Sequence, residues 1–270
     1  MDDRPIGVFD SGLGGLTTVR ELCRLLPEED IVYFGDTGRV PYGSRSRETI
    51  VKYARQDVAF LRTFDLKTIV IACGTVSTTA LDVLAAENPI PVLGVVAPAA
   101  RAAARATRSG SIGLIGTQAA IRSGAYERLI RAENPAARVL AQPCPLFVPL
   151  VENGRFRPGD VVIETVAAEY LAPLKEAGVD TLVLGCTHYP LLEKVIGAYM
   201  GPEVRLINSG AEGARAAADC LRERDALAGP GRGSCRCFVS DRQEDFSRLA
   251  STFLGWDVAQ AVEQVDISQY

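Results

Sequence analysis

Two segments of the chain share one pattern, in which an apolar, strand-like run ends in a small residue and a cysteine, and hydroxyl side chains follow. Cys73 follows the run Ile69–Ala72, and Cys186 follows the run Leu182–Gly185. In a parallel α/β sheet, ligands bind at the carboxyl ends of the strands. The pattern therefore predicts two thiols that face one ligand from opposite sides. Inversion of a carbon centre is the clearest chemistry that needs such a pair.

The side chains that follow the second cysteine make this segment the most specific of the chain. Thr187 and His188 come directly after Cys186, and His188 is the single histidine in the sequence. Two residues from Cys186 across a turn, the imidazole can reach the thiol or a ligand, where it can act as an acid or a base. The alternative is a histidine that only makes hydrogen bonds within its turn.

The first cysteine is expected at the amino end of a helix. The sequence predicts a helix over 77–87, and a helix dipole favours the thiolate form of a cysteine near its start. Ser77 or Thr78 is predicted to cap this helix. The alternative is a buried Cys73 without a chemical role.

The first predicted strand ends in a glycine-rich turn. Asp10 and Ser11 lead into Gly12–Gly15, whose glycines permit a tight turn and a close approach of the backbone to an anion. The turn matches neither the GxGxxG pattern nor a P-loop, because no lysine follows. The alternative is a plain strand-to-helix turn in which Asp10 or Ser11 caps the helix.

Two further loops contribute polar groups. Asp36 ends the second predicted strand, and Tyr42–Ser44 follow it after a proline. On their own these residues are typical of a turn-forming loop. Glu152 is predicted in a loop after an apolar segment, where an isolated carboxylate is normally solvated.

The elements that must position these residues alternate between strands and helices along the whole chain. This alternation predicts parallel sheets with right-handed crossovers. The predicted strands are 6–9, 31–34, 68–72, 92–95, 112–115, 139–141, 181–184, 204–207 and 238–240. The predicted helices are 16–26, 48–64, 77–87, one opened by Pro98, 119–132, 158–177, 211–221 and 245–254.

The alternation of strands and helices begins again after the fourth strand, so we expect an α/β protein of two similar doubly wound parallel-sheet domains. They are related by a pseudo-two-fold, and the active site lies in the cleft between them. The first domain is predicted to comprise residues 1–97 together with 208–270, and the second residues 98–207.

The composition excludes several classes of partner. The net charge is −4, which gives no electrostatic basis for binding nucleic acid or an anionic membrane. The start Met1–Pro5 is polar, and no run is apolar enough to span a membrane. We therefore expect a cytoplasmic protein that acts on a small molecule. A homodimer is expected as well, although the composition itself does not indicate it.

The cysteine count also favours a cytoplasmic protein with free thiols, because the seven cysteines are irregularly spaced. Cys235 and Cys237 form a C-x-C pair. The sequence has a single histidine and no second closely spaced cysteine pair, so we do not predict a zinc site. The remaining three cysteines are interpreted as core thiols at Cys23, Cys144 and Cys220.

Taken together, these segments resemble the glutamate racemases of the cofactor-independent aspartate/glutamate racemase superfamily. The resemblance extends over nearly the whole chain and includes both cysteine segments. The other matching segments are Val8–Gly15, Tyr33–Asp36 with Pro41–Gly43, Ile115–Thr117, Ser123–Tyr126 and Cys144–Glu152.

The resemblance implies a two-base racemase that interconverts L- and D-glutamate without a cofactor or metal and supplies D-glutamate for peptidoglycan. By the same resemblance, Cys73 takes the proton from D-glutamate and Cys186 acts on L-glutamate. Asp10, His188 and Glu152 match the groups that assist the two thiols. The implied substrate-binding set is Ser11, Tyr42, Gly43, Gly74, Thr75, Thr117 and Thr187.

The sequence departs from the family pattern at two positions. Gly74 stands where the family has a substrate-contacting asparagine, and Ala120 stands where it often has a threonine. Both changes remove polar side chains, so aspartate or another small acid stays open as a substrate. The same fold hosts aspartate and hydantoin racemases, maleate isomerases and malonate decarboxylases. A non-enzymatic alternative is a partner-binding protein, similar to family members that inhibit DNA gyrase.

Overall fold

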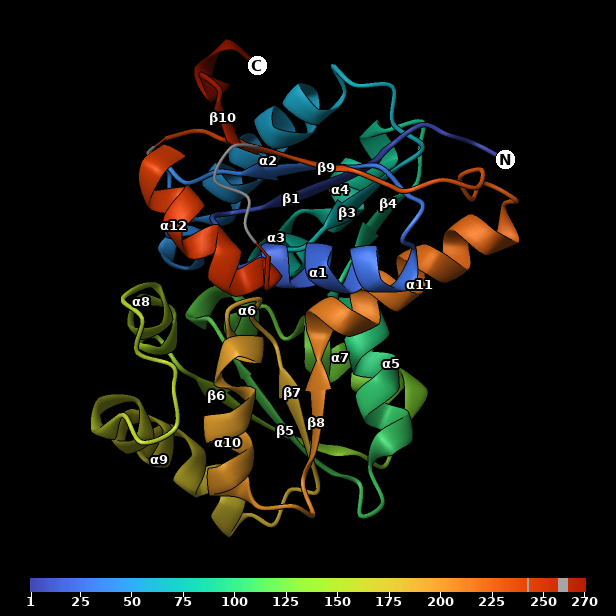
Figure 1. The fold of residues 1–270 in the computed structure, drawn as a ribbon. Coiled ribbons are helices and arrows are strands. Elements are labelled where there is room, and N and C mark those ends of the chain that lie inside the picture. The colour runs from blue at the N-terminus through green and yellow to red at the C-terminus, as the bar shows by residue number, and fades with distance from the viewer. Residues whose placement is uncertain (242, 257–261) are drawn as a thin grey trace.

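The computed structural model describes residues 1–241, 243–256 and 262–270. It contains two β-sheets, seen one above the other in Figure 1, and every strand pair in them is parallel. The first sheet consists of β1 (Ile6–Asp10), β2 (Ile31–Gly35), β3 (Thr68–Ile71), β4 (Val92–Gly94), β9 (Cys235–Val239) and β10 (Val262–Gln264). The second consists of β5 (Ser111–Gly116), β6 (Arg138–Pro143), β7 (Thr181–Leu184) and β8 (Arg205–Asn208).

The two sheets repeat one strand order. The first runs β10-β9-β2-β1-β3-β4 and the second β6-β5-β7-β8, so β2-β1-β3-β4 and β6-β5-β7-β8 are the same permutation. In each half the first strand is central and the third lies beside it. β3 and β7 therefore occupy equivalent places, and these are the strands that precede Cys73 and Cys186. The arrangement confirms the predicted fold class.

Helices cover both faces of each sheet (Figure 1). One face of the first sheet packs against α1 (Leu16–Leu25), α11 (Ser209–Glu223) and α12 (Gln243–Leu254), and the other against α2 (Arg47–Leu61), α3 (Gly74–Thr79) and α4 (Leu81–Glu87). The second sheet packs against α5 (Val96–Ala106) and α7 (Ala125–Glu133) on one face, and α9 (Val161–Glu176) and α10 (Glu193–Met200) on the other. The short elements are α6 (Gln118–Arg122), α8 (Phe147–Glu152) and the 3-10 helices η1 (Tyr42–Ser44), η2 (Tyr189–Leu192) and η3 (Ile267–Gln269).

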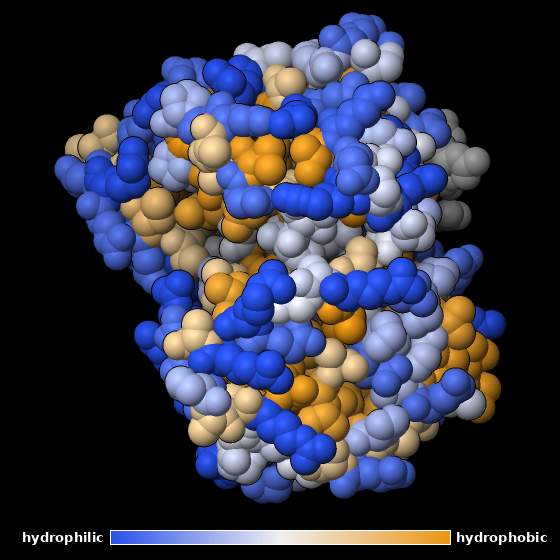
Figure 2. Space-filling model, turned by 180° about the vertical axis from the view of Figure 1, so that it is seen from behind, coloured by the Kyte–Doolittle hydropathy of each residue, from blue (hydrophilic) through white to orange (hydrophobic). Residues whose placement is uncertain are grey.

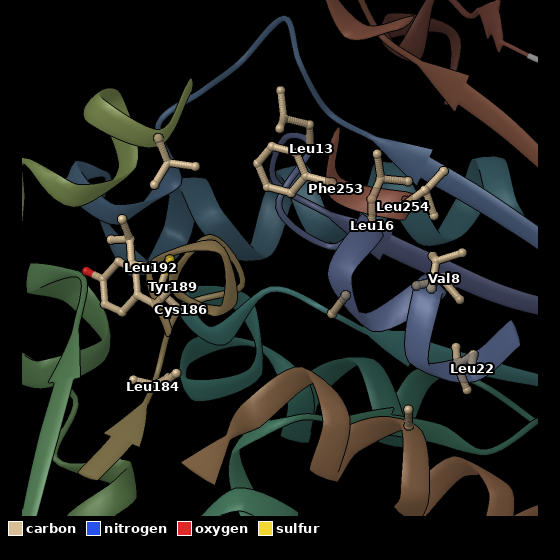
Figure 3. Packing of buried hydrophobic residues seen from close by; sticks show 14 of the residues in the cluster. Val8, Leu13, Leu16, Leu22, Leu184, Cys186, Tyr189, Leu192, Phe253 and Leu254 are labelled. Atoms are coloured by element: carbon tan, nitrogen blue, oxygen red, sulfur yellow. The ribbon is translucent and has the colours of Figure 1, made fainter. Parts of the chain in front are cut away.

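One apolar cluster runs through both halves of the molecule. Leu16 and Phe253 belong to it in the first half, and Leu184 and Tyr189 in the second (Figure 3). Because the cluster is continuous, its burial stabilises the two halves against one another as well as internally. On the outside, charged and polar residues are spread over the face shown in Figure 2, with apolar residues between them in both halves. Within the described residues, none of the helices has the length and apolar character needed to traverse a bilayer.

Two predicted helices are interrupted. The helix predicted over 77–87 is two helices, α3 and α4, and it begins directly after Cys73. The helix predicted over 119–132 divides into α6 and α7 because Gly124, at φ +62°, adopts the left-handed conformation that ends a helix. The helix that Pro98 was expected to open starts at Val96, and proline is tolerated in a first turn because its missing N–H is not needed there.

The short helices α8 and α10 were not predicted. The tail over 262–267 was not predicted as a strand, and it contributes β10 at the edge of the first sheet. All strands of the first sheet lie in 6–94 or 235–264, and those of the second in 111–208. The predicted domain division, 1–97 with 208–270 and 98–207, stays a prediction, and 242 and 257–261 lie outside the described residues.

Candidate active site

A cavity of about 380 Å³ lies where the carboxyl ends of the two sheets meet. Its wall combines the segments after β1 and β3 with the segments after β5 and β7, so each half contributes equivalent loops. Asp10 is the one predicted site residue outside the cavity wall. The structure brings the other eleven together around it: Ser11, Tyr42, Gly43, Cys73, Gly74, Thr75, Thr117, Glu152, Cys186, Thr187 and His188.

Cys73 occupies the N-cap position of α3, immediately after β3. It is buried, and its Sγ atom donates a hydrogen bond to the Ser11 hydroxyl at 3.3 Å. Burial raises the pKa of the Cys73 thiol to about 12, and the nearby charge of Asp10 acts in the same direction. Near neutral pH this group is therefore a thiol, able to give a proton.

Asp10 is buried at the end of β1, and its Oδ2 atom accepts a hydrogen bond from the Gly15 N–H at 3.0 Å. Burial raises the pKa of Asp10, opposed by the charge of His188 and by the backbone N–H groups. The helix cap weighed for Asp10 or Ser11 is not formed, because the N-cap of α1 is Gly15 and no side chain caps it; Asp10 instead accepts from Gly15 within the turn. The N–H of Gly15, at the start of α1, is occupied by this carboxyl group.

The predicted caps at Ser77 and Thr78 are wrong. The helix starts three residues earlier than expected, so both hydroxyls lie inside α3 rather than before it. The Ser77 hydroxyl donates to the Ile71 carbonyl at 3.0 Å, and the Thr78 hydroxyl to the Thr75 carbonyl at 2.9 Å. The residue at the N-cap is the cysteine itself.

A chain of three side chains surrounds the second thiol. His188 Nδ1 lies 3.8 Å from Cys186 Sγ, and His188 Nε2 lies 3.0 Å from Glu152 Oε1. Burial lowers the pKa of His188, but the contacts with Cys186 and Glu152 outweigh it and raise the pKa to about 10. A protonated imidazole therefore stands beside the Cys186 sulfur near neutral pH.

Glu152 is not the solvated loop residue that its local sequence indicates. It is the last residue of α8, and its side chain is 32% exposed, with the rest held against His188. The pairing partner is 36 residues further along the chain, so no local pattern reports it.

The glycine-rich turn after β1 packs against the second half of the molecule. A Cβ atom on Gly14 would lie 2.4 Å from both His188 Nδ1 and Thr187 Oγ1. From the helix that follows this turn, the Thr17 hydroxyl in α1 donates to the Thr187 carbonyl at 2.9 Å. The close approach predicted for these glycines is therefore an approach to the loop that holds His188.

Further contacts between the halves lie on the cavity wall. Thr75 Oγ1 and Thr117 Oγ1, from opposite halves, are 3.0 Å apart. A Cβ atom on Gly74 would lie 2.6 Å from the Gly185 carbonyl oxygen. Gly43 packs against Thr117, where a Cβ atom would meet the Thr117 Cβ at 3.1 Å. Small residues thus let the two halves meet closely around the cavity.

The predicted site residues leave out ten residues of the cavity wall, among them Cys144 and Gln118, although Gly12 and Ser44 lie in loops that were predicted to contribute to the site. Cys144 was interpreted only as a core thiol, and it is buried where the wall meets Tyr189, whose hydroxyl donates to the Cys144 carbonyl at 3.1 Å. Burial raises the pKa of this thiol. Cys144 directly follows β6, and this position at the carboxyl end of a strand is the signal that could have identified it as a wall residue. The others are Gly12, Val40, Pro41, Ser44, Pro145, Val148, Pro149 and Gly185.

All seven cysteines are free thiols, including Cys235 and Cys237, whose sulfurs are 4.0 Å apart. In the part of the chain that the structure describes, no group of three or more histidine, cysteine or acidic side chains is arranged to hold a metal ion.

Comparison with known proteins gives concordant matches. The Asp/Glu/Hydantoin racemase family model matches residues 9–217. A glutamate racemase of Geobacter metallireducens is 49% identical over 256 residues, which cover 94% of each chain. Glutamate racemase from Francisella tularensis, solved in complex with D-glutamate, matches all of both chains with a TM-score of 0.92 and 37% identity. The enzyme from Thermus thermophilus, in complex with β-chloro-D-alanine, also matches throughout, with a TM-score of 0.89 and 44% identity.

Proposed function

Because this chain belongs to the Asp/Glu/Hydantoin racemase family, we propose that it interconverts L- and D-glutamate, with Cys186 and Cys73 as the two proton-transfer groups. The observation that carries the proposal is the unequal environment of the two thiols. His188, with its pKa raised to about 10, stands beside Cys186, whereas burial and Asp10 raise the pKa of Cys73 to about 12. A positively charged imidazole thus faces Cys186 while Cys73 holds its proton, and this inequality is what two-base inversion requires.

Starting from L-glutamate, the Cys186 thiolate takes the α-proton and becomes a thiol. The electron pair of the broken C–H bond remains on the substrate as a carbanion. The Cys73 thiol then donates its proton to the opposite face of Cα and becomes a thiolate, which gives D-glutamate. The reverse reaction begins from the Cys73 thiolate, so the two resting forms of the enzyme differ in which sulfur holds the proton.

The carbanion must be stabilised by groups that are already in place. Thr75 and Thr117 offer hydroxyls at the cavity wall, and α3 and α6 both begin there, with Cys73 and Thr117 at their N-caps. Free first-turn N–H groups attract the carboxylates of the substrate and the charge that develops on it. In a cavity that excludes water these dipoles act more strongly than they do in solution.

The physiological role that follows is the supply of D-glutamate for peptidoglycan in the cytoplasm, by a homodimer that needs no cofactor. The names of the relatives support the substrate, and these further features come from the family resemblance. Gly74 and Ala120 are the positions at which substrate choice needs a direct test.

The test is a circular-dichroism assay of the purified protein with L-glutamate, D-glutamate and L-aspartate, run in H₂O and in D₂O. We expect ellipticity to decay to zero from either glutamate enantiomer and to stay constant with L-aspartate. In D₂O, early product carries deuterium at Cα while recovered substrate does not. Constant ellipticity with both glutamate enantiomers would overturn the proposed substrate. Deuterium appearing in substrate as fast as in product would overturn the two-base mechanism.

A further inference from the structure

A group of charged side chains is buried directly behind the cavity wall formed by Tyr42. The carboxyl groups of Asp36 and Asp57 are fully buried, and the Arg39 guanidinium lies between them. We call these four residues, Asp36, Arg39, Tyr42 and Asp57, the Asp57 cluster. Asp36 follows β2, Asp57 lies on α2, and Tyr42 begins η1, so the cluster joins three elements of the first half.

Most of the hydrogen-bonding capacity of the cluster is accounted for by ordinary donors. Arg39 Nε donates to Asp36 Oδ2 at 2.6 Å, and a terminal nitrogen of Arg39 donates to Asp57 Oδ1 at 2.8 Å. The Ser240 hydroxyl donates to Asp36 Oδ1 at 2.7 Å. The remaining oxygen, Asp57 Oδ2, lies 3.1 Å from the Tyr42 hydroxyl.

The contact between Asp57 and Tyr42 requires a proton from one of them. A phenol carries a single proton, and the Tyr42 hydroxyl makes its shorter contact with Asp36 Oδ2, so the phenol proton belongs to that bond. The second contact is then a hydrogen bond only if Asp57 Oδ2 carries a proton and donates it to the Tyr42 oxygen. With Asp36 and Asp57 both ionised and the phenol proton shared with Asp36, the 3.1 Å contact between Asp57 Oδ2 and the Tyr42 oxygen would hold no proton.

The charge balance of the cluster gives the same answer. Two carboxylates and one guanidinium would leave a buried negative charge, which is costly without a partner. The groups that face Asp57 are Asp36, Arg39, Tyr42 and, further away, Asp10. Burial together with the charge of Asp36 raises the pKa of Asp57 well above its ordinary value. One proton makes the cluster electrically neutral.

We propose that Asp57 is a positioning residue that stays protonated and donates to the Tyr42 hydroxyl, fixing the Tyr42–Gly43 wall in place for the substrate. The fixed wall has a defined partner, because Gly43 packs closely against Thr117 of the other half. Neutrality of the cluster also keeps an uncompensated negative charge away from an anionic substrate. The inference rests on the proposed function, since it concerns how that substrate is bound.

The first experiment compares Asp57→Asn with Asp57→Ala in the racemisation assay. An asparagine amide reproduces a protonated carboxyl, with its oxygen accepting from Arg39 and its nitrogen donating to Tyr42. We expect Asp57→Asn to keep KM and kcat within about twofold of the wild type. Asp57→Ala removes one buried partner from Tyr42 and one from Arg39, although both keep their bonds to Asp36. It should raise KM for glutamate about tenfold, the effect of one lost buried hydrogen bond, with a smaller change in kcat.

Asp180→Ala is the matched control. Asp180 also accepts several hydrogen bonds, from Thr107, Arg108 and Ser109, but it lies away from the cavity. Its loss should reduce thermal stability without changing KM. An equal rise of KM in Asp57→Asn and Asp57→Ala would mean that Asp57 acts as an ion, and this result would overturn the inference.

The second experiment observes the proton directly and needs no stable alanine variant. The infrared spectrum of the wild-type protein at neutral pH should contain a carboxylic-acid C=O band that shifts in D₂O and is absent from Asp57→Asn. An unchanged band in this variant would overturn the inference even if the wild type racemises glutamate. A wild type that does not racemise glutamate, but shows the Asp57 band, would instead count against the proposed function alone.

Discussion

The Nε2 atom of His188 lies 3.0 Å from Oε1 of Glu152, and this contact turns the Nδ1 side of the ring toward Cys186. A carboxylate on one side of an imidazole and a sulfur on the other both favour its protonated form. The histidine therefore brings a positive charge to the Cys186 sulfur, and Glu152 holds the ring in the orientation that delivers it.

Replacing Glu152 by glutamine should change how stability depends on pH. In the folded wild type the pKa of His188 is raised from 6.5 to about 10, so its contribution to stability is complete below 6.5 and is lost as pH rises towards 10. Glu152→Gln keeps the shape but removes the charge. We expect it to be less stable than the wild type by about 1 kcal/mol at pH 6, because the pair is partly exposed, and equally stable at pH 10. Urea denaturation at both pH values measures this.

The same variant should be slower, with an earlier loss of activity at high pH. Without Glu152, His188 loses its proton at lower pH, so kcat for L-glutamate falls about tenfold near neutrality, and the alkaline limb of the pH profile moves down. Asp160→Asn, another acidic residue of the second half but outside the cavity wall, should leave the limb in place. An unchanged alkaline limb of the pH profile in Glu152→Gln would show that Glu152 does not assist the proton transfer.

Each reactive cysteine should be separately essential for racemisation. Cys73→Ser and Cys186→Ser replace a thiol by a hydroxyl that is a far weaker acid, and loss of one proton-transfer group costs about 10²–10⁴-fold in kcat. Elimination of HCl from a β-chloro analogue of glutamate needs one base only, which takes the α-proton as chloride leaves. Cys73→Ser should therefore still release chloride from the L-analogue, and Cys186→Ser from the D-analogue. Full racemase activity in either variant contradicts the pairing, and Cys220→Ser, outside the cavity wall, serves as the active control.

The strands and the residues at their ends follow from local sequence. Runs such as Ile69–Ala72 and Leu182–Gly185 are apolar because both faces of a parallel sheet are covered, and this leaves a clear signal. The group after each run must lie at the carboxyl edge, which is why the sequence predicts Cys73 and Cys186 at one cavity.

Features that depend on distant partners leave no such signal. Glu152 lies at the end of a helix too short to show a period, and its importance comes from an imidazole far along the chain. Asp57 has the spacing of an ordinary helix residue, and its environment arises from a loop that folds over it. Gly124 is small and neutral in the sequence, but its left-handed conformation divides a predicted helix in two.

Gly14→Ala should disrupt the site through packing alone. The added methyl would lie 2.4 Å from His188 Nδ1, so the imidazole or the whole turn must move. Overpacking of this kind costs about 1–3 kcal/mol of stability, and displacement of a catalytic group by about 1 Å costs up to 10²-fold in rate. Gly197→Ala is the control. Gly197 lies within α10, and its added methyl would lie 3.7 Å from Leu206, an ordinary van der Waals contact. The control should be at least as stable as the wild type, as alanine is the better helix former. Thermal melts and kcat/KM distinguish the two variants.

Gly74→Asn introduces the side chain that the family resemblance implies at this position, yet we expect it to impair the enzyme. Its Cβ atom would lie 2.6 Å from the Gly185 carbonyl oxygen, which is backbone at the end of β7 and cannot rotate away. The halves must then separate around the cavity, and the loop of Cys186 moves with them. We expect kcat/KM to fall at least about tenfold, with most of the loss already present in Gly74→Ala, because the clash begins at Cβ. A gain in kcat/KM with asparagine but not with alanine would show instead that the amide is missing from the substrate site and that β7 yields to admit it.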